Sequence, residues 1–224
     1  MKKYVVIVAG GSGKRMASDT PKQFMKISGK PVLGYTMEKF YHFDKKMGII
    51  LVLPEDFIDY WKEICRESSL EIPHFIQKGG ETRFHSVKNG LEPVEDNSLV
   101  AIHDGVRPLV SQQTIERCYD TAKEKNTAVP VVPVHASLRK LKSKGSYPVD
   151  RSDYFIVQTP QVFSSSALKK AYQQEYHPLF TDDASVAEAY GMEIHLVEGN
   201  PENIKITTPS DFIIARSLVE EKSF

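Results

Sequence analysis

The 224-residue chain contains little cysteine, little tryptophan and no excess charge of either sign. It has two cysteines and one tryptophan, and its 29 lysine and arginine residues balance 29 aspartate and glutamate residues. Two cysteines cannot build a disulfide framework or a zinc site by themselves, so the composition favours a reducing compartment, and we expect a cytoplasmic protein. The zero net charge argues against a protein that binds nucleic acid through a globally basic surface.

Long hydrophobic runs are also missing. Met1-Lys2-Lys3 followed by the apolar run 4–9 imitates a signal peptide, but this run is short and leads into glycines rather than a cleavage site. Other apolar runs, such as 47–53, are too short to span a membrane. We therefore expect neither an export signal nor a membrane anchor.

Short β-branched runs alternate with amphipathic segments along the whole chain. The runs that predict buried strands are 5–9, 49–53, 99–103 and 128–132. Between them, Phe57, Trp61 and Ile64 share one face of a predicted helix, and the same spacing recurs at 115–122. This alternation predicts an α/β fold with three layers, in which helices cover both faces of a Rossmann-like, mostly parallel sheet. The length favours a single domain over residues 1–224.

Two helix starts are marked by their capping residues. Thr208, Pro209 and Asp211 predict the start of a last helix. Asp182 and Asp183, which follow a threonine, predict the start of another helix that ends near residue 191.

One stretch, 134–153, interrupts the alternation. It is typical of a polar β-hairpin, with a charged segment at 138–142, a turn at Lys144-Gly145-Ser146 and a second segment after it. An isolated two-stranded ribbon is marginally stable in water, so we expect this one to pack on the same ribbon of a second subunit. A flexible surface loop is the alternative. No aromatic stacking platform accompanies its basic side chains, which favours a solvated face over a nucleic-acid site.

The first candidate site is the glycine-rich loop after the first predicted strand. Its sequence is Gly10-Gly11-Ser12-Gly13-Lys14-Arg15-Met16, followed by Pro21-Lys22-Gln23. A Walker A loop would need serine or threonine after Lys14, and a dinucleotide-binding loop would need a glycine where Met16 stands. Bare glycine backbone with two cations, Arg15 and Lys22, suits a triphosphate and the added charge of a phosphoryl-transfer transition state. An ordinary basic loop is the alternative.

Basic residues are concentrated near the N-terminus although the whole chain is neutral. The charged residues of segment 1–30 are Lys2, Lys3, Lys14, Arg15, Lys22, Lys26 and Lys30 against Asp19 alone. This imbalance predicts a local positive field of the size that one nucleoside triphosphate requires.

A second candidate site follows the strand predicted at 99–103. Its sequence is His103-Asp104-Gly105-Val106-Arg107-Pro108. Ligands of open α/β sheets bind beyond the carboxyl ends of the strands. There Asp104 could hold Mg²⁺ or a hydroxyl group, and Arg107 could bind a phosphate through two hydrogen bonds. For His103 alone, a histidine satisfied within the core is the simpler interpretation.

Two weaker candidates lie elsewhere. Gly79-Gly80 precedes a predicted helix capped by Thr82 or Glu81, so backbone N–H groups, Glu81 and Ser86 could bind the edge of a base; a plain capped turn fits equally. Lys205 lies on an apolar strand predicted at 203–207, where an unpaired ammonium group would be costly. A phosphate partner would explain this lysine, and so would a side chain that extends to solvent.

Taken in order, these segments resemble the 2-C-methyl-D-erythritol 4-phosphate cytidylyltransferase family. The motifs that carry the resemblance, between residues 5 and 211, are Gly11-Ser12-Gly13-Lys14-Arg15-Met16, Pro21-Lys22-Gln23, Gly79-Gly80, His103-Asp104-x-x-Arg107-Pro108, Asp150-Arg151, Thr159-Pro160-Gln161 and Asn203-Ile204-Lys205. The resemblance implies a nucleotidyltransferase-type fold and an Mg²⁺-dependent homodimeric enzyme. Such an enzyme transfers CMP from CTP to methylerythritol phosphate and releases pyrophosphate, in the non-mevalonate route to isoprenoids. The segment 134–153 would be its dimerisation arm.

The resemblance also implies roles for individual residues. Arg15 and Lys22 would stabilise the transition state at the α-phosphorus, and Arg151 and Lys205 would position the acceptor phosphate. The nucleotide would be bound by Ala9, Gly10, Gly11, Gly13, Gly80, Glu81, Ser86 and Asp104. The acceptor would be bound by Asp104, Arg107, Ser137, Arg151, Thr159, Thr181 and Lys205. The arm residues would act in the partner's site, and Mg²⁺ would be held mainly by the triphosphate, with Asp104 as a candidate ligand.

Three positions depart from the family pattern. Glu81 stands where aspartate is usual, Gly105-Val106 replaces two alanines, and Ser137 replaces threonine. Each keeps the functional group or removes only bulk. The related ribitol 5-phosphate cytidylyltransferase family is the alternative acceptor class, and Asp150-Arg151 favours methylerythritol phosphate over it. A non-catalytic nucleotide-sensing protein is the alternative of another class, and it would not need Arg15 and Lys22 together.

Overall fold

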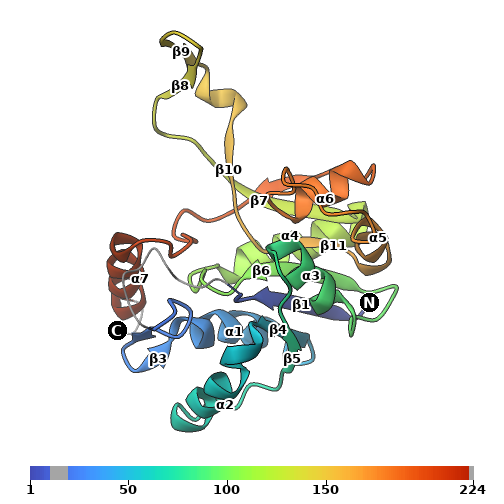
Figure 1. The fold of residues 1–224 in the computed structure, drawn as a ribbon, viewed down its shortest axis with the longest axis vertical. Helices are drawn as coiled ribbons and strands as arrows, with labels where there is room; N and C mark the ends of the chain where they lie inside the picture. Colours follow the sequence, from blue (N-terminus) through green and yellow to red (C-terminus); the bar gives the residue numbers. More distant parts are fainter. Residues whose placement is uncertain (11–19, 222–224) are drawn as a thin grey trace.

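A single sheet forms the centre of the molecule in the computed structural model, which describes residues 1–10 and 20–221 (Figure 1). Its strands are β1 (Lys3–Val8), β4 (Gly48–Leu53), β5 (Phe75–Lys78), β6 (Leu99–Asp104), β7 (Thr127–Pro133), β10 (Phe155–Val157), β11 (Gln161–Ser164) and β12 (Leu196–Glu198). Among the described residues the order is β10-β7-β11-β6-β1-β4-β5, with β12 beside β7. β1 pairs in parallel with β4 and β6, whereas β11 runs antiparallel between β6 and β7. The predicted mostly parallel sheet is confirmed.

Helices cover both faces of this sheet. They are α1 (Val32–Phe43), α2 (Ile58–Glu67), α3 (Arg83–Leu91), α4 (Gln112–Lys125), α5 (Ser165–Ala171) and α6 (Asp183–Ala189), while α7 (Pro209–Glu221) packs beside the sheet on the loop after β6 and the segment 203–207. Successive side chains of a strand point to opposite faces. Val5 and Ile7 of β1 therefore pack with α1, α2 and α4, whereas Tyr4 and Val6 pack with α3, α5 and α6. Burial on both faces explains why the strands are continuously apolar.

The remaining short elements connect the main ones. They are β2 (Lys26–Ile27), β3 (Lys30–Pro31) and the 3₁₀ turns η2 (Glu55–Phe57) and η3 (Arg151–Asp153). Within the residues that the structure describes, no helix is both long enough and apolar enough to cross a membrane.

The predicted strands agree with the observed ones to within one or two residues, with one exception. The strands expected at 5–9, 49–53, 99–103 and 128–132 correspond to β1, β4, β6 and β7. The strand expected at 203–207 is wrong, because this segment belongs to no strand. It lies instead against the loop after β6, where the N–H of Ile206 donates to the carbonyl oxygen of Val106 at 3.0 Å.

The predicted hairpin extends away from the body of the molecule (Figure 1). Its strands, β8 (Leu138–Leu141) and β9 (Ser146–Val149), pair antiparallel with each other. Gly145 closes the turn at φ +80°, a conformation that glycine adopts without steric cost. Leu141 is 81% exposed, so the hairpin has no core of its own in the single chain. Its packing against a second subunit stays a prediction.

Candidate active site

Two adjoining cavities lie at the carboxyl ends of β1 and β6. The first, here called the glycine cavity, has a volume of about 270 Å³, and Gly10 and Gly80 are among the residues that line it. The second, the threonine cavity, has a volume of about 250 Å³ and is bounded by Thr159 and Thr181. The two cavities share three charged lining residues, Arg83, Asp104 and Lys205. Molecules bound in the two cavities can therefore both contact these three charged side chains.

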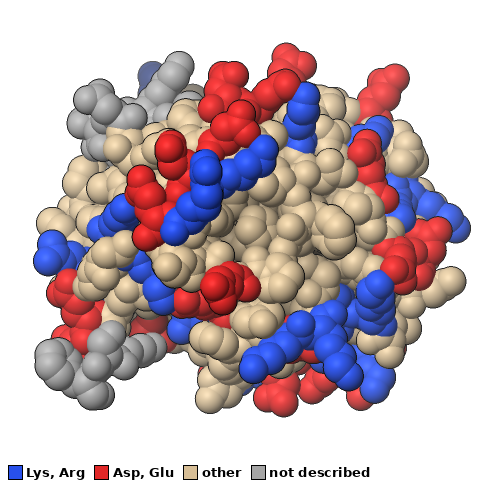
Figure 2. Space-filling model, turned by 90° about the horizontal axis from the view of Figure 1, so that it is seen from below, with Lys and Arg blue, Asp and Glu red and all other residues tan. Residues whose placement is uncertain are grey.

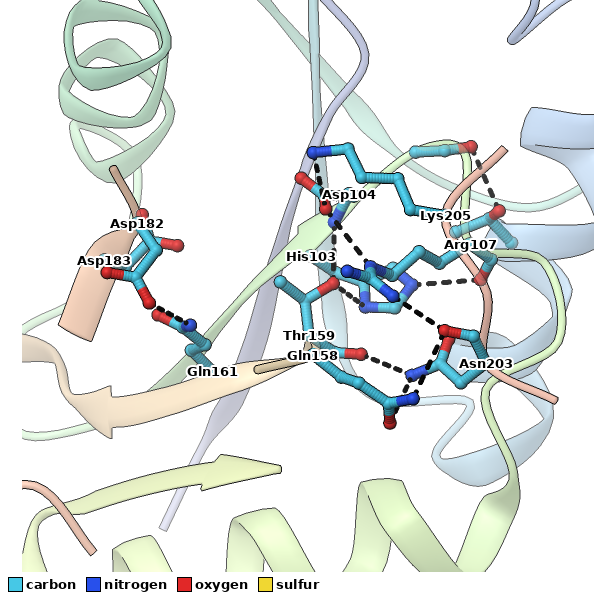
Figure 3. Close-up of polar contacts among 12 residues, drawn as sticks. His103, Asp104, Arg107, Gln158, Thr159, Gln161, Asp182, Asp183, Asn203 and Lys205 are labelled. Atoms are coloured by element: carbon cyan, nitrogen blue, oxygen red, sulfur yellow. Dashed lines mark hydrogen bonds and ion pairs between the residues drawn. The ribbon is translucent and has the colours of Figure 1, made fainter. Parts of the chain in front are cut away.

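Asp104, the last residue of β6, organises the charges between the cavities (Figure 3). Its Oδ2 lies 3.1 Å from Nζ of Lys205 and 3.2 Å from Nε of Arg107, and its Oδ1 lies 3.7 Å from Nε of Arg83. Burial alone would raise the pKa of Asp104, but the charges of Arg83, Lys205 and Arg107 outweigh it and hold that pKa well below its usual range. The carboxylate is therefore charged at neutral pH and restrains three cations.

His103 is fully buried beneath this cluster and is hydrogen-bonded at both ring nitrogens. Nε2 lies 3.2 Å from the carbonyl oxygen of Arg107, which can only accept, so this nitrogen carries the proton. Nδ1 then accepts from the Thr159 hydroxyl at 3.0 Å, and that hydroxyl accepts from the N–H of Asp104 at 3.1 Å. Burial lowers the pKa of His103 to about 4, so the ring is neutral at pH 7. The interpretation as a satisfied core histidine is confirmed.

Lys205 is held in the site by the segment that precedes it. Asn203 is buried, its side-chain amide donates to the carbonyl oxygen of Thr159 at 2.8 Å, and its own carbonyl oxygen accepts from Nη1 of Arg107 at 2.7 Å. Lys205 extends from this anchor to Asp104 and keeps 41% of its side chain exposed. Lys205 therefore pairs with a carboxylate, which neither of the two alternatives from the sequence, a phosphate partner or a side chain extended to solvent, had included. It still lines both cavities.

A glycine turn and the start of α3 form one wall of the glycine cavity. The N–H of Gly79 donates to the carbonyl oxygen of Leu53 at 2.7 Å, and the N–H of Gly80 donates to Oγ of Ser86 at 3.1 Å. A Cβ at Gly80 would lie only 2.4 Å from Cβ of His85, so the turn needs glycine there. Thr82, not Glu81, is the N-cap of α3. Ser86 therefore holds the turn in shape and also faces the cavity.

Lys22 also lines the glycine cavity and is 9% exposed. Both following residues fix the backbone at this point. The side-chain amide of Gln23 donates to the carbonyl oxygen of Ala9 at 2.9 Å. The ring of Phe24 packs against aromatic rings of α2 and the residue before it, with ring centroids 5.3 Å from Tyr60 and 5.7 Å from Phe57. Lys22 is thus mounted on a rigid turn beside the end of β1.

Comparisons with known proteins agree with this geometry. The family model of 2-C-methyl-D-erythritol 4-phosphate cytidylyltransferase matches residues 3–221. The chain belongs to this family. It is 55% identical over 219 residues to the protein of that name from Bacteroides fragilis, covering 98% of this chain and all of the relative. It is 50% identical over 220 residues to the one from Porphyromonas gingivalis, covering 97% of this chain and 98% of the relative.

Solved structures of the family have the same fold. A 2-C-methyl-D-erythritol 4-phosphate cytidylyltransferase from Thermus thermophilus superposes with a TM-score of 0.77 at 29% identity, covering 98% of this chain and all of the other. A 4-diphosphocytidyl-2C-methyl-D-erythritol synthase from Anaerococcus prevotii gives a TM-score of 0.82 at 26% identity, covering 98% and 96%. The family resemblance, the nucleotidyltransferase-type α/β fold and the prediction of a cytidylyltransferase are confirmed.

The structure gathers most of the residues that the family resemblance selected. The glycine cavity is lined by Ala9, Gly10, Lys22, Gly80, Glu81, Ser86, Asp104 and Lys205. The threonine cavity is lined by Asp104, Arg107, Thr159, Thr181 and Lys205. Gly11, Gly13 and Arg15 lie outside the described residues. Ser137 and Arg151 lie on the exposed arm, where Nη1 of Arg151 donates to the carbonyl oxygen of His135, and not in the cavities of their own chain.

Sequence reasoning missed Arg83, which lines both cavities of this cytidylyltransferase. Arg83 directly follows the capping residue Thr82 in the Gly79-Gly80 segment. This position, next to a candidate binding turn, is the sequence feature that could have identified it. Gln161 was noted only as a neighbour of Thr159 in the family motif, and both Gln158 and Gln161 line the threonine cavity.

The described residues do not build a metal cage. Among them, no group of three or more histidine, cysteine, aspartate or glutamate side chains is arranged to hold an ion. Asp104 has a cation facing each of its oxygens, which opposes a further cation there. The residues present therefore do not fit an ion that the protein alone holds.

Proposed function

We propose that this chain transfers CMP from CTP to 2-C-methyl-D-erythritol 4-phosphate and releases pyrophosphate. The observation that carries the proposal is the pair of cavities that meet at Arg83, Asp104 and Lys205 in a member of this family. The glycine cavity offers bare backbone and Lys22 to a nucleotide. The threonine cavity offers hydroxyl groups and Arg107 to a polyol phosphate.

The chemistry in this proposal needs positioning and charge more than proton transfer. An oxygen of the acceptor phosphate attacks the α-phosphorus of CTP, the bond from that phosphorus to the bridging oxygen breaks, and pyrophosphate leaves with the electron pair. In this proposal Lys22, together with Arg15 as the family resemblance implies, stabilises the negative charge that develops at the phosphorus, and Lys205 holds the acceptor phosphate. The acceptor phosphate is already ionised at neutral pH, so orienting it accounts for most of the catalysis.

Mg²⁺ enters this proposal as part of the nucleotide substrate. The family resemblance implies the ion, and a triphosphate supplies oxygen ligands of the kind that Mg²⁺ prefers. Asp104 keeps the role of a charge partner for Lys205 and Arg107, because its oxygens face these cations.

The experiment that tests the reaction is pyrophosphate release from CTP with each acceptor in turn. We expect release with methylerythritol phosphate and none above background with ribitol 5-phosphate. Release with ribitol phosphate alone would overturn the proposed acceptor. Binding of CTP without release in the presence of either acceptor would support a nucleotide sensor instead.

We further propose a homodimer in which each arm completes the site of its partner. The arm leaves the body of its own chain (Figure 1), so Ser137 and Arg151 need a second subunit to meet a cavity. Phe155 and Ile156 of β10, at the base of the arm, are 50% and 53% exposed and offer an apolar surface for that subunit.

Subunit mixing tests this arrangement. Lys22→Ala damages the body of the site, and Arg151→Ala damages the arm, so each homodimer has two damaged sites. If arms act in the partner's site, each mixed dimer contains one intact site, and an equal mixture recovers about a quarter of the wild-type activity. If Arg151 serves its own chain, both sites of a mixed dimer stay damaged. If mass spectrometry shows that mixed dimers have formed but no activity is recovered, the proposal that each arm acts in its partner's site would be refuted.

We also propose that the protein works on small molecules in the cytoplasm. Cys65 and Cys118 are free thiols, and burial raises their pKa to about 11 and about 12, in keeping with a reducing compartment. On the face shown in Figure 2, basic and acidic side chains are interspersed around uncharged surface. A continuous basic track, which a nucleic acid would favour, does not appear on that face.

A further inference from the structure

Arg83 lies between two carboxylates at the wall that the two cavities share. Its Nη1 and Nη2 donate to Oδ1 and Oδ2 of Asp183 at 3.0 and 2.6 Å. Its Nε faces Oδ1 of Asp104 at 3.7 Å, which is an ion pair but too long for a hydrogen bond. The guanidinium is therefore bound tightly by Asp183 and only loosely by Asp104.

Asp183 itself is a rigid anchor. Its carboxylate is fully buried and accepts a further hydrogen bond, at 2.6 Å, from the hydroxyl of Tyr172. It is the first residue of α6, where the helix dipole favours a negative charge. Gln161 of β11 fixes this helix start, since its amide accepts from the N–H of Ala184 at 2.8 Å and donates to Asp182 at 2.9 Å (Figure 3).

The two carboxylates compete for one guanidinium. If Asp183 did not hold Arg83, the guanidinium could turn toward Asp104 and form two hydrogen bonds with it. Asp104 would then be less available to Lys205 and Arg107, which it contacts at 3.1 and 3.2 Å. Lys205 would lose its restraint at the point where the two substrates must meet.

We propose that Asp183 is a positioning residue for the transfer reaction. It holds the Arg83 guanidinium at the common wall of the two cavities and keeps it off Asp104, so that Asp104 restrains Lys205 and Arg107. This inference rests on the proposed function, because the acceptor phosphate is what Lys205 would hold. It predicts a defect in use of the acceptor rather than in nucleotide binding.

Asp183→Asn tests the inference in the full-length protein, with steady-state kinetics for both substrates. The amide keeps the size of the side chain but loses the charge that holds Arg83. We expect kcat/KM for methylerythritol phosphate to fall by roughly 10- to 100-fold, while the affinity for CTP stays within about threefold of wild type. Arg83→Lys should give the same pattern, because an ammonium group cannot bond both oxygens of Asp183 while facing Asp104.

A double variant separates positioning from stability. In Arg83→Met the buried Asp183 is unpaired, so the melting temperature should fall, and adding Asp183→Asn should restore part of it. If Asp183 acts through Arg83, the double variant has the same acceptor kcat/KM as Arg83→Met alone, although it is more stable. Because the double variant buries no unpaired charge, it remains informative even if Asp183→Asn folds poorly.

Tyr172→Phe is the matched control. It removes one hydrogen bond to Asp183 and leaves both bonds to Arg83, so we expect reduced stability with an acceptor kcat/KM close to wild type. An active wild type with unchanged acceptor kcat/KM in Asp183→Asn would overturn the inference, as would a further loss in the double variant. A wild type that releases no pyrophosphate with methylerythritol phosphate would instead refute the proposed function, and this inference with it.

Discussion

Asp104→Asn is the substitution whose consequences the structure defines most sharply. Asp104 is 7% exposed and faces Lys205, Arg107 and Arg83 at 3.1, 3.2 and 3.7 Å. Asparagine has the same size but removes the negative charge, and its amide N–H₂ group would face a cation. Three positive charges would then lie close together without the negative charge between them, so both stability and activity should fall.

The size of the stability loss follows from burial. Removing one partner of a buried ion pair costs about 3–5 kcal/mol. The side chains of Lys205 and Arg83 keep 41% and 30% exposure, so water recovers part of this loss, and we expect about 2–3 kcal/mol. For a domain of this length, each kcal/mol lowers the melting temperature by about 2–4 °C, so the expected decrease is about 4–12 °C.

The pH dependence of that difference is the stricter test. The pKa of Asp104 in the folded protein lies well below its usual range, because the three cations outweigh the effect of burial. A group with a depressed folded pKa contributes stability that is fully present above its unfolded pKa of about 4 and is lost as the pH falls toward the folded pKa. The wild type should therefore exceed Asp104→Asn in stability by a constant amount between pH 6 and 8, and by progressively less below about pH 4.

Urea unfolding of both proteins at several pH values measures this difference. Asp96→Asn is the control, because it removes an exposed carboxylate that pairs with Lys169 at 3.0 Å on the surface. That change should cost no more than about 1 kcal/mol. Equal stability of Asp104→Asn and wild type at pH 7, or a difference that grows on acidification, would refute the account of Asp104 as a charged anchor.

Three further outcomes follow from the geometry of the glycine cavity and α3. Lys22→Ala should lower kcat by about 100-fold or more while CTP still binds, as measured by calorimetry and pyrophosphate release; an unchanged kcat would exclude Lys22 from the transition state. Gly80→Ala should weaken CTP binding about tenfold or more, because its Cβ would meet His85 at 2.4 Å, whereas Gly79→Ala, with a nearest approach of 3.3 Å, should be milder. Gly90→Ala would place a Cβ 2.5 Å from Val6 and should destabilise the protein by about 1–3 kcal/mol in urea unfolding.

The fold was largely predictable because its signals are local. The strands β1, β4, β6 and β7 are buried on both faces, and this burial leaves continuous apolar runs in the sequence. Thr208 and Asp211 likewise marked the start of α7, since the Thr208 hydroxyl accepts from the N–H of Asp211 at 3.3 Å. The segment 203–207 misled the prediction because its apolar residues Ile204 and Ile206 pack under α7 rather than within the sheet.

The site was only partly predictable because its decisive contacts are distant in sequence. The glycine turns and the polar residues at strand ends are visible locally, and in the structure Gly10, Gly80 and Asp104 line the cavities, as does Thr159 of the family motif. The partners of Asp104 come from three separate segments. Nothing near Arg83 in the sequence indicates that its strongest partner lies 100 residues away, on a helix whose first acidic residues predicted only a helix start.

Charge shows most clearly what the fold adds to the sequence. The lysines of segment 1–30 predicted a positive field at the glycine loop, yet several of them pair with acids from other segments: Lys2 with Glu95, Lys3 with Asp44, Lys26 with Glu67, and Lys30 with Glu38. The cations that line the threonine cavity are instead Arg83, Arg107 and Lys205, from α3 and two loops, and two of them, Arg83 and Lys205, also line the glycine cavity. Asp104 and Asp183 restrain these three charges, and two carboxylates against three cations leave one positive charge in excess. A phosphate that crosses this wall therefore meets cations whose positions are already fixed by buried acids, which is the arrangement that charge stabilisation of a transition state requires.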